Sequence, residues 1–396
     1  MRVVLYSHDA QGLGHTRRNL AIAAALAATG GVDVLLITGA RESAGFAMPP
    51  GVDCLTLPAV SKSLAGEYQP RSLALSLPAL IRLRARTIRA AVEAFAPDVL
   101  IVDKLPAGLH GELLPTLEML RARGDVRVVL GLRDVLDQPH VVCHEWLRTG
   151  AQKLMRSSYD AIWVYGDPRV YDLGAEYCLD PDLSARLRWT GYLGRSWCPD
   201  GSHPSPPALR DVPAGPLALC LVGGGQDGFP LARAFAAAKL PTGTTGVVVT
   251  GPFMPADERS ELAACAAARQ DLCVLPFVPE PGPLIDRAGS IVSMGGYNVL
   301  CELLHVGRRP LVVPRVRPRH EQLIRGERLA AAGVLDLLPP AQLCPERLSA
   351  WLAAPMPMDR HPRDVIDLEG LSRLPALLDD ALSAPVGREE PDAVAA

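Results

Sequence analysis

Several signatures of other protein classes are missing from this sequence. It has no apolar run of about 18 residues, the length that a membrane-spanning helix needs, and its first eight residues are too short and too soon interrupted for a signal peptide. Its nine cysteines include no Cys-x-x-Cys pair, and no His-x-x-His pair accompanies them. We therefore expect free thiols in a reducing cytoplasm, no disulfide framework, no metal site, and at most a peripheral contact with a membrane.

A strong imbalance of charge is also missing. The formal net charge is -3, charged residues make up 21% and apolar residues 48% of the chain, which are ordinary values for a soluble globular protein. This balance gives no sign of nucleic-acid binding. With 396 residues the chain is too long for one hydrophobic core, so two domains are expected.

What the sequence does contain is an alternation of short apolar runs with helical segments. The first half has runs that predict strands at 3–7, 33–38, 52–57, 98–102, 126–131 and 160–165. The second half has similar runs at 217–222, 246–250, 271–275, 290–292 and 310–313. Such alternation predicts doubly wound parallel sheets, in which ligands bind beyond the carboxyl ends of the strands.

The stretch from Ser293 to Glu302 is the most informative. A predicted strand leads into Gly295-Gly296, and a helical pattern follows. Adjacent glycines let the backbone approach a ligand, and the first helical turn suits a phosphate. Glu302 lies roughly 9 Å beyond the helix start, so its carboxylate can accept hydrogen bonds from a sugar while the turn holds the phosphate. A glycine turn without any ligand explains the same pattern.

Two other polar junctions follow predicted strands in this half. The run Gly223-Gly224-Gly225-Gln226 precedes a helix predicted to begin near Pro230. Three consecutive glycines are costly in entropy unless the backbone takes unusual angles or approaches a ligand. The segment 314–322, after the strand predicted at 310–313, is rich in hydrogen-bonding side chains.

The amino-terminal junction is a glycine loop that ends in a histidine. Gly12 and Gly14 precede His15, and Thr16 is a candidate N-cap for an alanine-rich helix predicted at 17–28. The spacing is not the Gly-x-Gly-x-x-Gly of a dinucleotide site. An imidazole with an ordinary pKa of about 6.5 can take a proton from an attacking hydroxyl near neutral pH. The alternative is a loop histidine that only caps the helix.

Two aspartates stand directly after predicted strands of the same half. Asp103 and Asp134 can orient His15 or meet a substrate, because the carboxyl ends of parallel strands share one edge. Each can instead cap the next turn. A helix predicted within 71–95 carries three arginines on one face, which suits either an anionic membrane or plain solvent: Arg82, Arg86 and Arg89.

The order of these motifs resembles that of the GT-B glycosyltransferases, in particular the family of the bacterial peptidoglycan (lipid II) UDP-N-acetylglucosamine transferase. In that family a Ser-Arg-Ala-Gly-type turn leads to a glutamate that binds the ribose, and a proline-led segment ending in Gln-Gln meets the donor sugar. By resemblance Glu302 would bind the ribose, and Glu321 and Gln322 the sugar. The sequence departs from the family at Met294, where arginine is usual, and at Glu321, where glutamine is usual, which leaves the identity of the sugar open.

The resemblance also assigns the remaining site residues. The family has a Gly-Gly-Ser-Gln-Gly loop at the donor, an aromatic-aliphatic pair against the uracil, and a loop ending in Gly-His that faces the acceptor. The implied donor site comprises Gly224, Gly225, Gln226, Phe277, Val278, Gly295, Gly296, Tyr297, Asn298, Glu302, His320, Glu321 and Gln322. The implied acceptor side comprises Gly12, Gly14 and Thr16, with His15 as the base and Asp103 and Asp134 as further catalytic candidates. Phe277 can also be plain core.

The fold implied by the resemblance is α/β, a GT-B fold with two Rossmann-like domains facing each other across a cleft. We expect an acceptor-binding domain at 1–195 and a linker at 196–216, which is dense in Pro, Ser and Gly. A nucleotide-sugar-binding domain is expected at 217–366. A helix at 367–383 would pack back on the first domain, and a disordered tail would follow at 384–396.

The implied function is transfer of a sugar from a UDP-sugar, with UDP-N-acetylglucosamine as a candidate, to an acceptor hydroxyl. The acceptor would be a small molecule, a lipid-linked molecule or a glycan, and inversion at the anomeric carbon is expected. No cofactor beyond the UDP-sugar and no metal are expected, because helix amino termini near Gly224 and Gly296 would stabilise the leaving diphosphate. The expected location is the cytoplasm, with the inner membrane face as a candidate peripheral site. A nucleotide-sugar epimerase and a non-catalytic nucleotide-sugar binding protein remain alternatives on the same fold.

Overall fold

A computed structural model describes residues 1–8, 14–41, 43, 46–62, 68–194, 212–278, 280–354 and 360–383 of the chain. These residues form two compact units. The first comprises Met1–Leu193 and the segment from Glu369 onward, and the second comprises Gly194–Leu368. Most of the predicted linker and all of the predicted tail lie outside the described residues, so both stay predictions.

The first unit is built on a seven-stranded sheet in the order β3-β2-β1-β6-β7-β8-β9, with every neighbouring pair parallel. Its strands are β1 Arg2–Ser7, β2 Asp33–Thr38, β3 Val52–Thr56, β6 Val99–Asp103, β7 Arg127–Arg133, β8 Ala161–Tyr165 and β9 Leu187–Trp189. The apolar runs predicted as strands are all present, with ends shifted by at most two residues. β9 was not predicted, because its three residues are too short to give a pattern.

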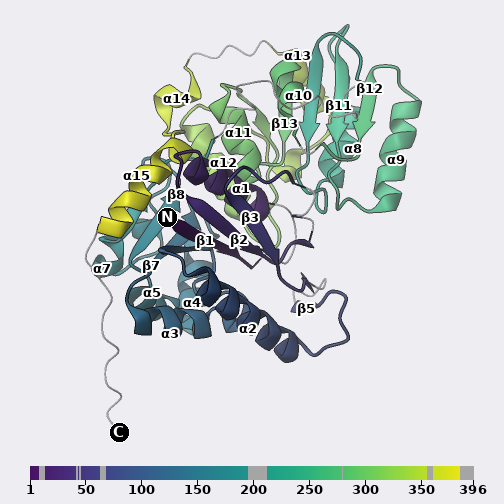
Figure 1. The fold of residues 1–396 in the computed structure, drawn as a ribbon. Helices are drawn as coiled ribbons and strands as arrows, with labels where there is room; N and C mark the ends of the chain where they lie inside the picture. The colour runs from purple at the N-terminus through teal and green to yellow at the C-terminus, as the bar shows by residue number, and fades with distance from the viewer. Residues whose placement is uncertain are drawn as a thin grey trace. The chain divides into compact units, whose positions relative to one another are not determined.

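Helices cover this sheet (Figure 1). The helices α2 Leu77–Phe95, α3 Leu114–Arg123, α4 Pro139–Thr149 and α5 Ala151–Ser158 group together below the sheet in the view, while α1 Gly14–Ala27 packs against α15 Gly370–Ser383. Shorter elements are the hairpin of β4 Val60–Lys62 and β5 Tyr68–Pro70, η2 Leu109–Gly111, α6 Leu173–Glu176 and α7 Pro181–Ser184. α2 shows why these helices form, since its buried residues recur every four positions: Leu80, Arg84, Ile88 and Val92.

One of these buried residues is an arginine, and it ties α2 to the end of β1. Arg84 donates to the carboxylate of Glu112 at 2.5 and 2.8 Å, and to the carbonyl oxygens of Pro58 at 2.8 Å and His8 at 3.2 Å. The hydroxyl of Tyr6 donates to the same carboxylate. A buried ion pair is tolerated only when its hydrogen bonds are satisfied. This network therefore holds the backbone at His8, where the amino-terminal loop begins.

The second unit is built on a six-stranded parallel sheet in the order β12-β11-β10-β13-β14-β15. Its strands are β10 Leu217–Leu221, β11 Thr245–Val249, β12 Leu272–Leu275, β13 Ala288–Ser293, β14 Leu311–Val312 and β15 Asp336–Leu337. Its helices are α8 Phe229–Ala237, α9 Ala256–Ala267, α10 Gly282–Arg287, α11 Tyr297–His305, α12 Glu321–Ala331, η4 Pro340–Gln342, α13 Pro345–Ala353 and α14 Pro362–Val365. Alternate residues of β10 enter two different core clusters, so this sheet is covered on both faces.

Both sheets reverse their strand order at an equivalent place. In the first unit the chain passes from β1 to β2 on one side and later returns to β6 on the other, and β10 has the same relation to β11 and β13. In doubly wound sheets the ligand binds beyond the carboxyl ends of the strands at this switch point. Ser7 pairs with Asp103 there in the first sheet, and Leu221 pairs with Ser293 in the second.

Candidate active site

The first candidate site lies at the switch point of the first sheet. His15 is the second residue of α1, and Asp103 is the last residue of β6. Nδ1 of His15 lies 2.6 Å from Oδ2 of Asp103. The Asp103 side chain is 1% exposed and the His15 side chain 16% exposed, so a buried carboxylate contacts an imidazole that reaches solvent.

Arg18 completes this group. It follows His15 by three residues on α1, and its Nη2 atom lies 2.7 and 2.6 Å from the two oxygens of Asp103. Burial alone would raise the pKa of the Asp103 carboxyl, but the charges of Arg18 and His15, and hydrogen bonds from both, hold this pKa well below its usual range. Asp103 is therefore ionised at neutral pH.

The ionised carboxylate determines which nitrogen of His15 is suited to act as a base. A lone pair on Nδ1 would repel the oxygen of Asp103 at 2.6 Å, whereas a proton on Nδ1 forms a hydrogen bond with it. We assign the proton to Nδ1 on this ground. Nε2 then carries the lone pair that can accept a proton from a substrate.

A second histidine lies beside the first. His8 directly follows β1 and is buried, and its ring meets that of His15 edge to face with the ring centres 5.1 Å apart. Its Nδ1 atom has no hydrogen-bond partner among the described residues. Burial, followed by the charges of His15 and Lys104, lowers the pKa of His8 well below its ordinary value, so its ring is neutral at pH 7.

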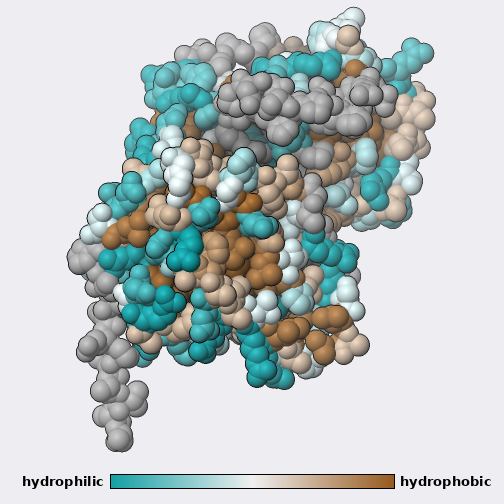
Figure 2. All heavy atoms as spheres, viewed as in Figure 1, coloured by the Kyte–Doolittle hydropathy of each residue, from teal (hydrophilic) through white to brown (hydrophobic). Residues whose placement is uncertain are grey.

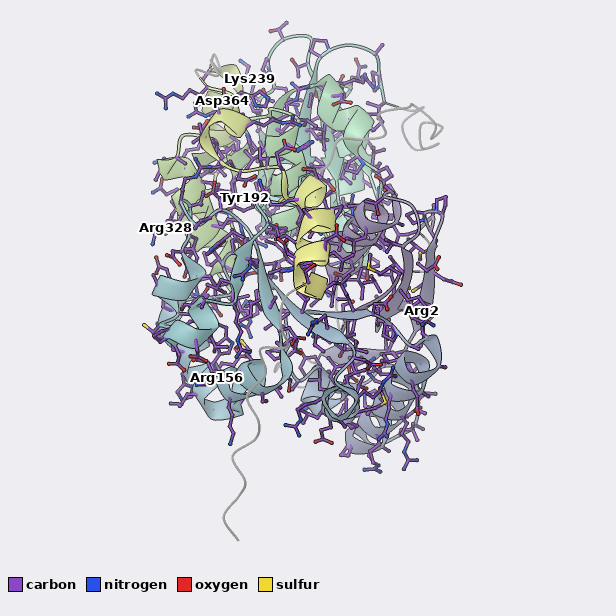
Figure 3. All side chains as sticks on the ribbon, turned by 60° about the vertical axis from the view of Figure 1, so that its left-hand side comes forward. Arg2, Arg156, Tyr192, Lys239, Arg328 and Asp364 are labelled. Carbon is purple, nitrogen blue, oxygen red and sulfur yellow. The ribbon has the colours of Figure 1, made fainter. Side chains whose placement is uncertain are left out.

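The structure separates the two predicted aspartates. Asp103 contacts His15, whereas the buried Asp134 accepts a hydrogen bond at 3.0 Å from the hydroxyl of Tyr192, which is labelled in Figure 3. The predicted N-cap is wrong, because α1 begins at Gly14 and Thr16 lies inside its first turn with a buried side chain. Gly12 lies outside the described residues.

Arg18 and His8 are the members of this group that the sequence interpretation missed. The signal for Arg18 was its spacing, because residues three apart in a helix lie on the same face and His15 is predicted to stand at the start of one. The signal for His8 was its place directly after a buried strand, where the carboxyl edge of the sheet begins. Neither signal is specific without the position of Asp103.

The second candidate site lies at the switch point of the second sheet, where two glycine turns follow neighbouring strands. Gly225 has φ +94, and a Cβ there would overlap the carbonyl oxygen of Thr250. Gly295 has φ +82, and a Cβ there would lie 2.7 Å from Cγ1 of Val312. These two positions therefore need glycine for the backbone alone. Gly224 and Gln226 are exposed on the same loop: they are the part of it that a ligand can reach.

The helix α11 begins directly after the second of these turns. Gly296 stands at its N-cap and supplies no side-chain cap, so this terminus is of the kind that binds anions through backbone N–H groups. Tyr297 is buried as the first helical residue, and the guanidinium of the buried Arg325 lies 5.3 Å from its ring centre. Asn298 is half-buried. Glu302, 4% exposed, lies in the second turn.

The segment before α12 brings predicted sugar-binding residues next to the glycine loop. Arg315 contacts the buried Glu321 at 2.6 Å and the exposed Asp227 at 3.1 Å, and its backbone N–H donates to Oε1 of Gln322 at 2.9 Å. His320 precedes α12 and makes no side-chain cap. The sequence interpretation missed Arg315 and Asp227, whose contact across 88 positions only the tertiary structure shows.

The predicted uracil pair follows β12, and its two side chains differ in burial. Val278 is 3% exposed and belongs to a core cluster. Phe277 is half-buried. Phe277 is therefore the member of the pair that can offer surface to a base.

The sequence contains one Asp-x-Asp triplet, a pattern that can hold a metal in glycosyltransferases. In this structure both of its carboxylates form ion pairs with an arginine. Asp180 and Asp182 flank Pro181 at the start of α7, and Arg156, labelled in Figure 3, contacts them at 2.6 and 3.4 Å. Within the described ranges no three His, Cys, Asp or Glu side chains are grouped so as to hold a metal.

The surface of the first unit carries the predicted basic face. Arg82, Arg86 and Arg89 are exposed on α2. Figure 2 shows apolar surface at the lower right, over the segment between β5 and α2, where Leu73 and Leu75 are exposed. No helix in the described part of the chain is long and apolar enough to span a membrane. Contact with a membrane surface stays a prediction.

No family model matches the chain. Bacterial proteins named UDP-N-acetylglucosamine--N-acetylmuramyl-(pentapeptide) pyrophosphoryl-undecaprenol N-acetylglucosamine transferase are similar to part of it. The protein from Agrobacterium fabrum (strain C58) is 29% identical over 109 residues, which cover 27% of this chain and 29% of the relative. The protein from Rhizobium rhizogenes (strain K84) is 27% identical over 161 residues, which cover 38% of this chain and 42% of the relative. The matched segments thus span less than half of each relative.

Solved structures match over nearly the whole chain. The calicheamicin glycosyltransferase CalG4 superposes with a TM-score of 0.61 at 17% identity, covering 97% of this chain and all of its own. The glycosyltransferase VinC in complex with dTDP gives 0.60 at 16%, covering 96% and 98%. A putative UDP-N-acetylglucosamine 2-epimerase from Listeria monocytogenes gives 0.56 at 13%, covering 98% and 92%.

These likenesses show the fold. The chain has the GT-B fold, and the predicted α/β class is confirmed by its two parallel sheets. The predicted resemblance to the lipid II N-acetylglucosaminyltransferase family is confirmed as a distant similarity.

Proposed function

We propose that this protein is a glycosyltransferase that moves a sugar from a UDP-sugar to an acceptor hydroxyl with inversion at the anomeric carbon. The observation that carries the proposal is the 2.6 Å contact between Nδ1 of the partly exposed His15 and the buried carboxylate of Asp103. This contact is what a general base at Nε2 requires. The GT-B fold and the similarity to two N-acetylglucosamine transferases support the same reading.

The first unit would activate the acceptor. Nε2 of His15 takes the proton of the acceptor hydroxyl as its oxygen attacks the anomeric carbon, and the adjacent carboxylate of Asp103 stabilises the imidazolium that forms. The bond between the anomeric carbon and the diphosphate oxygen breaks as the new bond to the acceptor oxygen forms. The acceptor class is a small molecule, a lipid-linked molecule or a glycan.

The second unit would bind the donor. Glu302 would accept hydrogen bonds from the ribose hydroxyls, and Glu321 and Gln322 would contact the sugar. The diphosphate gains negative charge as it leaves, and the N–H groups near Gly224 and at the start of α11 would stabilise that charge. No metal ion takes part in the proposed reaction.

The proposed donor is UDP-N-acetylglucosamine, which the names of the two similar transferases specify for those proteins. A thymidine nucleotide is the first alternative, because the VinC structure contains dTDP. The proposed location is the cytoplasm, with peripheral contact at the inner membrane face if the acceptor is lipid-linked.

Calorimetric binding of UDP, with GDP and dTDP as controls, tests the donor assignment. We expect selective binding of UDP that weakens about tenfold or more in Glu302→Ala, since a buried hydrogen bond to a ligand is lost, and that is unchanged in Glu327→Ala on the exposed face of α12. Absence of binding to any nucleotide would contradict the proposal. Product analysis then distinguishes a transferase, which needs an acceptor, from an epimerase, which changes the sugar without one.

A further inference from the structure

We propose that Arg18 is a positioning residue that holds His15 as a neutral base, with the proton on Nδ1 and the lone pair on Nε2. The catalytic meaning of this inference rests on the proposed function. The protonation state itself does not, and it can be measured without any substrate.

The geometry shows that Arg18 and His15 share one carboxylate. Oδ2 of Asp103 lies 2.6 Å from Nδ1 of His15 and 2.6 Å from Nη2 of Arg18, and those two nitrogens are 2.8 Å apart. Nη2 also lies 2.7 Å from Oδ1. The negative charge of Asp103 is thus divided between a permanent cation and an imidazole.

This sharing opposes protonation of His15. A buried carboxylate alone would stabilise the imidazolium strongly and raise the pKa of His15, so that the ring would carry two protons and could not act as a base near neutral pH. The guanidinium of Arg18, whose Nη2 atom lies 2.8 Å from Nδ1, opposes a second positive charge on the ring. At the effective dielectric constant of protein sites, a unit charge at this range shifts a pKa by about one to three units.

The surroundings keep Arg18 in place. It is buried, and its guanidinium lies 5.7 Å from the ring centre of Tyr165 on β8, within the range of a cation–π contact. Burial, and then the charge of Asp103, raise the pKa of Tyr165, so its hydroxyl stays neutral. The Tyr165 side chain in turn lies over Gly131 of β7, where a Cβ would overlap it. Position 131 must therefore be glycine for Tyr165 to lie there.

Three further titratable groups lie close to this group of residues in the described part of the chain. His8, after β1, is neutral because burial lowers its pKa. Lys104, after β6, is a further cation beside His8 and acts in the same direction as Arg18. Tyr165 is neutral. Asp103 and Arg18 are the opposed charges that contact Nδ1 of His15 in the described residues.

NMR titration of the full chain labelled with 13C,15N-histidine tests the proposal. The resonances of His15 are assigned from their absence in His15→Gln. In the wild type we expect nitrogen shifts typical of a proton on Nδ1. In Arg18→Met we expect the pKa of His15 to rise by about one unit or more. Tyr165→Phe, which keeps the ring and removes only a neutral hydroxyl, is the matched control and should leave the pKa unchanged.

Two further variants keep the test decisive if Arg18→Met does not fold. Arg18→Lys retains the charge and should shift the pKa of His15 by less than half as much. Asp103→Asn removes the negative charge that contacts both groups and should lower the pKa of His15 below its ordinary value of about 6.5. An unchanged or lower pKa in Arg18→Met, a pKa at or above 6.5 in Asp103→Asn, or a wild-type proton on Nε2 would each overturn the inference. Failure to bind nucleotide would overturn the proposed function, but the titration would still test the protonation state of His15.

Discussion

The two sheets have seven and six strands, share the same strand order around the switch point, and carry different groups at that point. In the first unit the carboxyl edge carries charged side chains, with Asp103 buried between His15 and Arg18. In the second unit the equivalent edge carries glycines at positive φ and the start of α11, so backbone groups line it together with side chains such as Glu302 and Glu321. A shared topology therefore determines where a site forms, and the local residues determine its chemistry.

The contrast fits the two tasks of the proposed transfer reaction. Moving a proton needs a titratable group whose protonation state is held by neighbouring charges. Binding a diphosphate needs N–H groups at fixed positions, which a backbone with no Cβ in the way provides. The following predictions test this division, from the largest expected effect to the smallest.

Substitution of the base should produce the largest effect. His15→Ala should lower the rate of sugar transfer about 10²- to 10⁴-fold, because the proposed general base is removed. UDP affinity should not change, since the donor is assigned to the second unit. The rate is measured as UDP release in the presence of acceptor, with His144→Ala on the exposed face of α4 as the control. Full turnover in His15→Ala would remove the functional difference between the units.

In the glycine loop, the effect of a substitution on stability should depend on the backbone conformation at the substituted position. Gly225→Ala should lower the free energy of unfolding of the second unit by about 3 kcal/mol, because alanine is strained at φ +94 and its Cβ overlaps the Thr250 carbonyl. Gly224→Ala is the matched control, since its Cβ would meet only Phe253 at 3.5 Å. Urea denaturation, monitored by hydrogen exchange in each unit, measures the free energy of unfolding of both variants. Equal stability of the two variants would contradict the backbone argument.

Mild acid should destabilise the first unit selectively. His8 is neutral when folded because its pKa is lowered, so the unfolded chain binds a proton below pH 6.5 that the folded chain does not. Stability from this group is complete above about pH 6.5 and falls by up to about 1.4 kcal/mol per pH unit below it. The lowered pKa of Asp103 adds a further loss only below about pH 4.

Hydrogen exchange at pH 7 and pH 5 measures this difference. Peptides of β1 and β6 should lose protection at pH 5, whereas those of β10 and β13 should not. His8→Gln should abolish the loss while leaving the protection at pH 7 in place. A loss of the same size in both units would show that His8 is not its source.

Removal of metal should have the smallest effect. EDTA should leave UDP binding and turnover unchanged, because Arg156 already contacts both carboxylates of the Asp-x-Asp triplet. Asp182→Ala should change the free energy of unfolding by less than about 0.5 kcal/mol, since its ion pair is partly exposed. A loss of activity in EDTA that Mg²⁺ restores would show that donor binding or turnover needs a metal ion.

The predictable parts of the fold and the sites were those encoded locally. The apolar runs predicted the central strands of both sheets closely, because a strand buried on two faces is apolar throughout. β9 and β15 were missed, because strands of two or three residues at a sheet edge give no pattern. The helix α1 starts earlier than predicted, since the capping pattern at Thr16 also occurs inside a first turn.

In the two candidate sites, too, local features were predictable from the sequence and contacts between distant segments were not. His15 and Asp103 were both candidates, but Asp134 was an equal one, and only the register of β1 beside β6 brings Asp103 to the histidine. The contact between Arg315 and Asp227 joins segments 88 positions apart, which no local pattern reveals.

By itself the sequence determined the class of fold, the two glycine turns and the residue types at the strand ends, because these depend on periodicity and backbone freedom over a few neighbouring residues. The tertiary structure decided which charged groups come into contact. The parallel pairing of β1 with β6 brings Asp103, and not Asp134, against His15 and Arg18. The protonation state of the proposed base depends on these contacts. Electrostatic interactions depend on the distances between charged groups, and the amino-acid sequence does not specify those distances directly.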